Sequence, residues 1–249
     1  MNYVLCSNPR SGTTLLCDLL TRTGQAGCPD SYFQERFLDD WAEGWGLPTP
    51  VSADASEAAR RYVAAARLAG QGGTPVFGLR LMAPDLDFAC RWLDRLHPGL
   101  PSDRARLEAA FGPLRFIHLS RQDKLAEAVS YVRAEQTGLW HRNADGSDLE
   151  RFDPAAPEGF DAEAIRARRD ALIAEDARWQ GWFRTEGIAP LRLTYEDLAA
   201  NPAGTLARVL ETLGLDPALA LGMTPGLSPL ADETTARWIA QFRSLSPDP

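Results

Sequence analysis

Apolar and polar positions alternate along the chain in blocks typical of strands followed by helices. Four short apolar runs predict buried strands at Tyr3–Ser7, Val76–Met82, Leu114–Ser120 and Leu191–Thr194. Strands buried on both faces favour a parallel sheet. Helical periodicity and cap residues predict helices at Thr13–Thr23, Ala53–Ala69 ending at Gly70, Asp85–Leu96, Asp103–Phe111, Asp123–Thr137, Asp161–Thr185, Pro202–Leu213 and Asp232–Phe242. We expect an α/β fold with a central, mostly parallel sheet flanked by helices.

The spacing of these elements leaves no room for an interdomain linker, so residues 1–249 are expected to form a single domain. The segment from His141 to Gly159 is polar and rich in Pro, Asp and Gly. We expect it to be an irregular loop, or a lid over a site.

Charge and composition exclude several functions. The formal net charge of −8 argues against a nucleic-acid polymer as partner, because that binding requires a broad basic face. No segment approaches the roughly 18 apolar residues that a membrane span requires. The four cysteines form no C-x-x-C pair, which predicts reduced thiols and a cytoplasmic protein. The three histidines lack ligand spacing, so no metal is expected, and the oligomeric state stays open, a homodimer included.

The chemistry of the chain is concentrated where the first strand ends. Its loop contains Arg10, Ser11, Gly12, Thr13 and Thr14 and runs directly into a helix. Unpaired N–H groups at a helix start attract anions, glycine allows close approach of the backbone, and arginine offers a fork of donors for phosphate or sulfate oxygens. The loop lacks the lysine of the ATP-type P-loop. A simple turn with a hydroxyl cap is the alternative interpretation.

A second strand, turn and helix repeats this architecture over residues 116–140. Arg121 lies in its turn, and Ser130 follows on the helix. In a parallel sheet both turns emerge at the carboxyl edge, where open α/β folds bind ligands. Two anion sites at this edge indicate a ligand with two phosphate groups.

The loop S-N-P-R-S-G-T-T together with R-Q-D and A-V-S resembles the paired phosphate-binding signatures of sulfotransferases that use 3′-phosphoadenosine 5′-phosphosulfate (PAPS). Within that superfamily, the segments T-G…G-x-P…Y-F, V-F-G-L-R-L-M, S-Y-V-R-A-E-Q-T-G-L-W and W-I-A-Q-F-R are similar to the bacterial trehalose 2-sulfotransferase and lipopolysaccharide sulfotransferase family. The resemblance covers nearly the whole chain. It implies a P-loop-like sulfotransferase fold and transfer of a sulfuryl group from PAPS to a carbohydrate hydroxyl.

The resemblance also implies roles for individual residues. It implies that the 5′-phosphosulfate is bound by Arg10, Ser11, Gly12, Thr13 and Thr14. It also implies that the 3′-phosphate is bound by Arg121 and Ser130. Arg10 is expected to stabilise charge during transfer. Arg80, at the end of its strand, is expected either to face the acceptor or to form a surface ion pair. Three aromatic residues near the proposed cleft are expected to stack on a sugar ring, namely Tyr32, Phe33 and Trp140.

Two positions depart from the family pattern. Relatives carry a glutamate as catalytic base in G-x-P-x-E-[YF]-F, and Ser31 stands at that position here. Asp30 and Glu35 are the expected substitutes, because a serine hydroxyl is no base near neutral pH. The run Pro229–Asp232 lacks the arginine that relatives often carry there.

Two other functions remain open on this evidence. One is a nucleotide-dependent phosphotransferase, which would bind magnesium ATP. The other is a sulfotransferase-like protein that binds nucleotide without turnover, because Ser31 has replaced the carboxylate. The acceptor, either a trehalose-like glycolipid precursor or a lipopolysaccharide sugar, cannot be read from the sequence.

Overall fold

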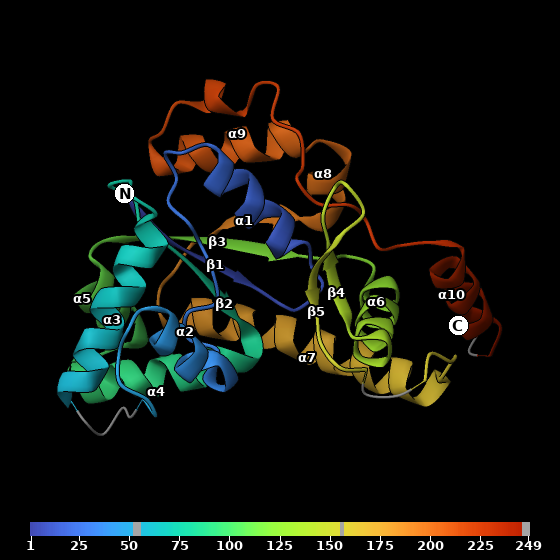
Figure 1. Ribbon diagram of the computed structural model, residues 1–249, viewed down its shortest axis with the longest axis horizontal. Coiled ribbons are helices and arrows are strands. Elements are labelled where there is room, and N and C mark those ends of the chain that lie inside the picture. The colour runs from blue at the N-terminus through green and yellow to red at the C-terminus, as the bar shows by residue number, and fades with distance from the viewer. Residues whose placement is uncertain (52–55, 155–156, 246–249) are drawn as a thin grey trace.

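The computed structural model describes residues 1–51, 56–154 and 157–245 and contains a four-stranded sheet at its centre (Figure 1). The strands are β1 (Asn2–Ser7), β2 (Gly78–Met82), β3 (Leu114–Ser120) and β6 (Leu191–Thr194). Their order is β2-β1-β3-β6, and every pair is parallel. The expected parallel sheet of the α/β fold is confirmed, with all four strands at the predicted places.

Helices cover both faces of the sheet because β1 buries its side chains alternately on either side. Tyr3 and Leu5 pack into a core with α1 (Thr13–Arg22) and α9 (Pro202–Leu213). Val4 and Cys6 pack into a second core on the opposite face. That core is completed by residues of α3 (Ser56–Gln71), α4 (Leu86–Leu96), α5 (Asp103–Phe111) and α7 (Ala162–Thr185).

The remaining helices lie beside these layers. Three short 3-10 turns are η1 (Glu35–Phe37), η2 (Ala83–Asp85) and η3 (Pro217–Ala220). The α-helices are α2 (Leu38–Gly44), α6 (Lys124–Thr137), α8 (Tyr195–Ala200) and α10 (Glu233–Leu245). In Figure 1, α10 lies beside α6 at the C-terminal end of the chain. No helix in the described part of the chain combines the length and apolarity needed to cross a membrane.

The segment after α6 differs from expectation. It forms a two-stranded antiparallel hairpin, β4 (Leu139–Arg142) and β5 (Asp148–Arg151), where an irregular loop or a lid over a site was predicted. Both strands are short and partly exposed, so they leave no alternating apolar pattern in the sequence. The prediction also included residues 155–156, which lie outside the described residues.

The α3 helix differs from the predicted helix at both ends. The predicted start at Ala53 lies outside the described residues. The predicted stop at Gly70 is wrong by one residue, because the helix continues to Gln71, and it is Gly72 and Gly73 that adopt positive φ angles. Position 70 requires glycine for a different reason, because a Cβ there would lie 2.6 Å from the ring of Phe77.

Candidate functional site

The loop between β1 and α1 forms one wall of the site. Gly12 caps α1 with a left-handed backbone, φ 86°, and among the described residues no side chain hydrogen-bonds as a cap there. The opening N–H groups of α1 are therefore not satisfied by a capping side chain. A Cβ at Gly12 would lie 2.6 Å from the ring of Tyr195, so only glycine lets the loop approach α8 this closely.

Arg10 is the central cation of the site. Its backbone is left-handed, with φ 69°, which is unusual for a residue with a side chain. The guanidinium donates to the hydroxyl of Ser130 at 3.0 Å and to the carbonyl of Trp140. Burial, reinforced by the charge of Arg121, lowers the pKa of Arg10 to about 10. The loop thus holds a buried positive charge that an anion would stabilise.

Arg121 supplies a second positive charge to the same cavity. Its guanidinium lies 4.5 Å from the ring centre of Tyr195. Within the described residues, its buried Nε atom has no hydrogen-bond partner. The start of α6 is already capped, because Asp123 accepts from the N–H of Ala126. The N–H groups of Gln122 and Asp123 also donate to Glu196, so an anion bound in this turn would depend mainly on side chains.

These residues share one cavity of about 1040 Å³ at the carboxyl edge of the sheet. Small-molecule pockets typically measure 300–1,000 Å³, so this one has room for a nucleotide and a second ligand. The expected residues that line it are Arg10, Gly12, Thr13, Thr14, Arg80, Arg121, Ser130 and Trp140. The glycine cradle, the unpartnered Nε of Arg121 and the paired cations suit a ligand with two anionic groups.

Arg80 joins the loop between β1 and α1, named the donor loop here for its hydrogen-bond donors (residues 8–14), to the segment that contains Ser31. Its Nε donates to the hydroxyl of Ser31 at 2.9 Å, Nη1 to the hydroxyl of Thr14 at 3.0 Å and Nη2 to Asp30 Oδ1 at 2.7 Å. Burial tends to lower the pKa of Arg80, but the charge of Asp30 and further groups raise it on balance. Arg80 therefore forms a largely buried ion pair with Asp30 and also lines the cavity, while its role toward an acceptor stays a prediction.

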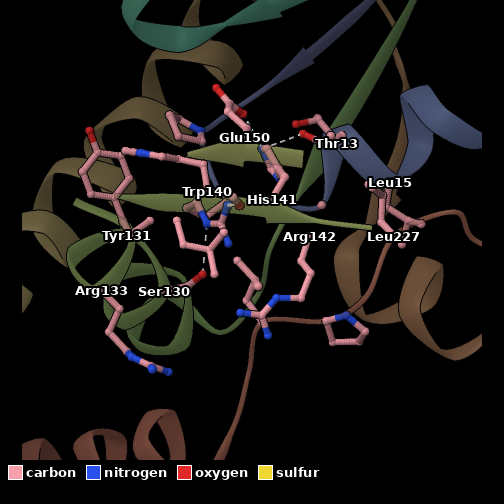
Figure 2. A pocket seen from close by; sticks show the side chains of 18 of the residues that line it. Thr13, Leu15, Ser130, Tyr131, Arg133, Trp140, His141, Arg142, Glu150 and Leu227 are labelled. Carbon is pink, nitrogen blue, oxygen red and sulfur yellow. Dashed lines mark hydrogen bonds and ion pairs between the residues drawn. The ribbon is translucent and has the colours of Figure 1, made fainter. Parts of the chain in front are cut away.

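The β4–β5 hairpin packs against the donor loop and lines the same cavity, and the sequence assigned none of its polar residues to the site. His141 Nε2 lies 3.0 Å from Thr14 Oγ1 and 3.3 Å from Glu150 Oε2. Burial and the charges of Arg10 and Arg80 lower the pKa of His141 to about 3, so its ring is neutral at pH 7. Figure 2 shows His141 and Glu150 side by side on the hairpin, away from Ser130.

Several expected site residues do not face this cavity. Tyr32 and Phe33 are 2% and 1% exposed and pack in the aromatic core, so the expectation that they border the cleft is wrong. Rings in that core bury more apolar area than rings at an open cleft. Ser11 is buried, and its hydroxyl donates to the carbonyl of Asn8 at 2.7 Å. Glu35 is exposed on η1 and is not among the described residues that line the cavity.

Asp30 lies at the edge of the sheet, where its backbone carbonyl accepts from the N–H of Arg80 at 3.1 Å. One carboxylate oxygen, Oδ1, accepts from Arg80 and also from the N–H of Ser31 at 2.7 Å. Asp30 therefore orients Arg80 and the adjoining loop, and it lies behind the residues that line the cavity.

Helix α7 contacts both the loop after β1 and the start of α6. Asp176 Oδ1 accepts from Asn8 Nδ2 at 2.6 Å, and Asp176 Oδ2 contacts Lys124 Nζ at 2.6 Å. Trp179 Nε1 donates to the carbonyl of Ser7 at 3.0 Å. Lys124 also pairs at 2.8 Å with Glu127, a fully buried residue. One helix thereby fixes the end of β1 relative to the start of α6.

The chain is similar to known proteins over nearly its whole length. The family model described as Stf0 sulphotransferase matches residues 2–245. A trehalose 2-sulfotransferase of Mycobacterium tuberculosis is 30% identical, covering 98% of this chain and 95% of its own length. A trehalose 2-sulfotransferase of Mycolicibacterium smegmatis is 31% identical, covering 97% and 94%.

Solved structures with lower sequence identity also match. A sulfotransferase domain from the curacin biosynthetic pathway has a TM-score of 0.49 at 16% identity and covers 96% of each chain. A sulfotransferase from Alicyclobacillus acidocaldarius has a TM-score of 0.43 at 15% identity, covering all of this chain and 97% of the other.

Proposed function

Because the chain belongs to the Stf0 sulphotransferase family, we propose that this sulfotransferase moves a sulfuryl group from PAPS to a hydroxyl of a carbohydrate. Both curated relatives bear the name trehalose 2-sulfotransferase. A trehalose-like glycolipid precursor is therefore the first acceptor to test, with a lipopolysaccharide sugar as the second. We place the reaction in the cytoplasm, since all four cysteines are free thiols.

The observation that carries this proposal is the pair of cations, Arg10 and Arg121, in one cavity. Two guanidiniums from two different strand–helix turns oppose each other's charge, which contributes to the lowered pKa of Arg10. Anionic groups bound at both turns would relieve this repulsion. Adenosine with phosphate groups at its 3′ and 5′ positions has two such groups on one ligand.

We assign different binding roles to the residues in the cavity. Arg10, Gly12, Thr13 and Thr14 would hold the 5′-phosphosulfate at the start of α1, while Arg121 and Ser130 would hold the 3′-phosphate. When bound, PAPS supplies the sulfuryl group and a bisphosphate leaving group. Arg10 would stabilise the negative charge that develops on the leaving oxygen. Arg80 and Trp140 would line the space left for the acceptor.

The direct test incubates the purified full chain with ³⁵S-labelled PAPS and a panel containing trehalose, glucose, glucosamine and a lipopolysaccharide core oligosaccharide. Label in a sugar, with equimolar release of adenosine 3′,5′-bisphosphate, is the expected result. Nucleotide binding without label in any sugar would support the non-catalytic alternative. Phosphate transfer from magnesium ATP would support the phosphotransferase.

A further inference from the structure

The cavity contains carboxylates that neither the family pattern nor the sequence motifs indicate, and one of them is placed to act on the acceptor. We propose that Glu150, on strand β5, is the general base that removes the proton of the acceptor hydroxyl. This inference rests on the proposed function. It assigns the role that Ser31 cannot perform to a residue about 120 positions further along the chain.

The position of Glu150 connects it to the donor loop. Its Oε2 lies 3.3 Å from His141 Nε2, and that nitrogen lies 3.0 Å from Thr14 Oγ1. Thr14 in turn accepts from Arg80, whose Nε reaches the hydroxyl of Ser31. A chain of contacts thus joins Glu150 to the position where relatives carry their carboxylate.

The hydrogen-bond roles in this chain leave Glu150 available. Thr14 accepts from the N–H of Arg80, so its own proton can point to His141. The Nε2 atom of neutral His141 either accepts from Thr14 or donates to Glu150 Oε2, depending on the tautomer. Apart from His141, no hydrogen-bond donor among the described residues reaches the Glu150 carboxylate. In either tautomer, Glu150 Oε1 can accept a substrate hydroxyl.

The electrostatic surroundings suit a base. Burial raises the pKa of Glu150, and Asp30 adds to that rise, whereas Arg80, Arg36 and Arg10 lower the pKa. The resulting carboxylate is more basic than an exposed glutamate, which favours its acceptance of a proton from a hydroxyl.

The other carboxylates fit the role less well. Asp30 Oδ1 already accepts two hydrogen bonds, and Glu35 lies outside the cavity lining. Asp85 lines the cavity, and burial raises its pKa to about 6. In the described structure, however, Asp85 has no hydrogen bond or ion pair that connects it to the donor loop. Asp85→Asn therefore tests the competing candidate for the base.

The reaction step that follows is balanced. The acceptor oxygen forms a bond to sulfur while the bond between sulfur and the bridging phosphate oxygen breaks. Adenosine 3′,5′-bisphosphate leaves with the electron pair of that bond. The proton of the acceptor hydroxyl passes to Glu150, which returns it to solvent after the product departs.

The test compares wild type, Glu150→Gln, Glu150→Asp and Asp85→Asn, all as full chains with ³⁵S-labelled PAPS and the best acceptor from the sugar panel. Transfer rates are measured from pH 5 to 9, and adenosine 3′,5′-bisphosphate affinity is measured by calorimetry. Glu150→Gln should lower kcat by about 10²-fold or more and remove the acidic limb of the pH profile, with little change in nucleotide affinity. Glu150→Asp should retain the acidic limb of the pH profile, with a lower rate of sulfuryl transfer.

Three outcomes would overturn the assignment. Glu150→Gln could retain wild-type kcat, Asp85→Asn could show the loss instead, or Glu150→Gln could lose nucleotide affinity in parallel with rate, which would indicate a structural role. Failure of the wild-type chain to sulfate any sugar is a separate result. It would refute the proposed function, and the base assignment with it.

Discussion

The guanidinium of Arg10 donates to the hydroxyl of Ser130 at 3.0 Å, although 120 residues separate them in the sequence. The family resemblance assigns these two residues to opposite ends of the nucleotide, one to the 5′ group and one to the 3′ group. Their contact joins the loop between β1 and α1 directly to helix α6. If the proposed nucleotide binds here, Arg10 lies between its two anionic groups.

Arg121→Ala should weaken adenosine 3′,5′-bisphosphate binding by roughly 10- to 100-fold, because a charge-assisted hydrogen bond to phosphate contributes about 1.5–3 kcal/mol. Adenosine 5′-monophosphate, which lacks the 3′-phosphate, should bind as it does to wild type. Calorimetry with both nucleotides measures the difference. Arg237→Ala, an exposed site on α10, is the control. Equal losses for the two nucleotides would remove Arg121 from the 3′ site.

Gly12→Ala should abolish nucleotide-induced thermal stabilisation, since the new Cβ would lie 2.6 Å from Tyr195 and push the loop off α8. Gly24→Ala is a matched control, with a similar φ of 64° and nothing within 4 Å of its Cβ. The control should lose only about 1 kcal/mol of stability from the left-handed backbone and still bind nucleotide. Thermal melts with and without adenosine 3′,5′-bisphosphate separate the two effects. If adenosine 3′,5′-bisphosphate raised the melting temperature of both variants equally, the steric argument would be refuted.

The strands could be predicted from the sequence where burial imposes a run of apolar residues. β1 and β3 lie between two layers of helices, and buried runs of apolar residues identified them. The β4–β5 hairpin could not be found this way, because its strands bury no complete face. Tyr32 and Phe33 show the same limitation. An apolar pair beside a motif fits a core and a cleft equally well until its neighbours are known.

Ser31→Glu should restore sulfuryl transfer in the Glu150→Gln variant by about 10-fold or more, because a carboxylate would again stand beside Arg80. Ser31→Gln in the same background is the matched control, with nearly the same volume and no basic group. Initial rates with labelled donor compare the two. If glutamate and glutamine give the same rate at position 31, the acceptor hydroxyl does not lie beside that position.

Glu127→Gln should change how stability depends on pH. Burial raises the pKa of Glu127 to about 7 in the folded protein, despite the ion pair with Lys124, whereas the ordinary value is 4.5. The folded state therefore binds more protons than the unfolded state between these values. The stabilising effect of protonation is complete below about pH 4.5 and is lost as pH rises through 7.

The measurement is the free energy of urea unfolding from pH 4.5 to 8 for wild type and Glu127→Gln. The wild-type value should fall more steeply with rising pH over this window than that of the variant. Glu211→Gln, at an exposed position of α9, should preserve the wild-type slope. Identical slopes for wild type and Glu127→Gln would place the ionisation of Glu127 outside the window.

The donor loop was predictable because its chemistry is local: an arginine, a glycine and hydroxyls lie between one strand and one helix. The environment of Glu150 is not local. The residues that surround its carboxylate come from the donor loop, β2, the segment around η1 and the hairpin itself. No spacing rule connects such segments, so only the folded arrangement identifies this carboxylate.

Helix α7 contacts the first loop through Leu172, Asp176 and Trp179, which recur at the period of a helix and so share one face. Inserting a single residue between Leu172 and Trp179 would rotate one end of that face by about 100° relative to the other. The contacts to Asn8 and Ser7 could then no longer form together. We therefore expect natural relatives to tolerate substitutions along this helix far more readily than changes in its length.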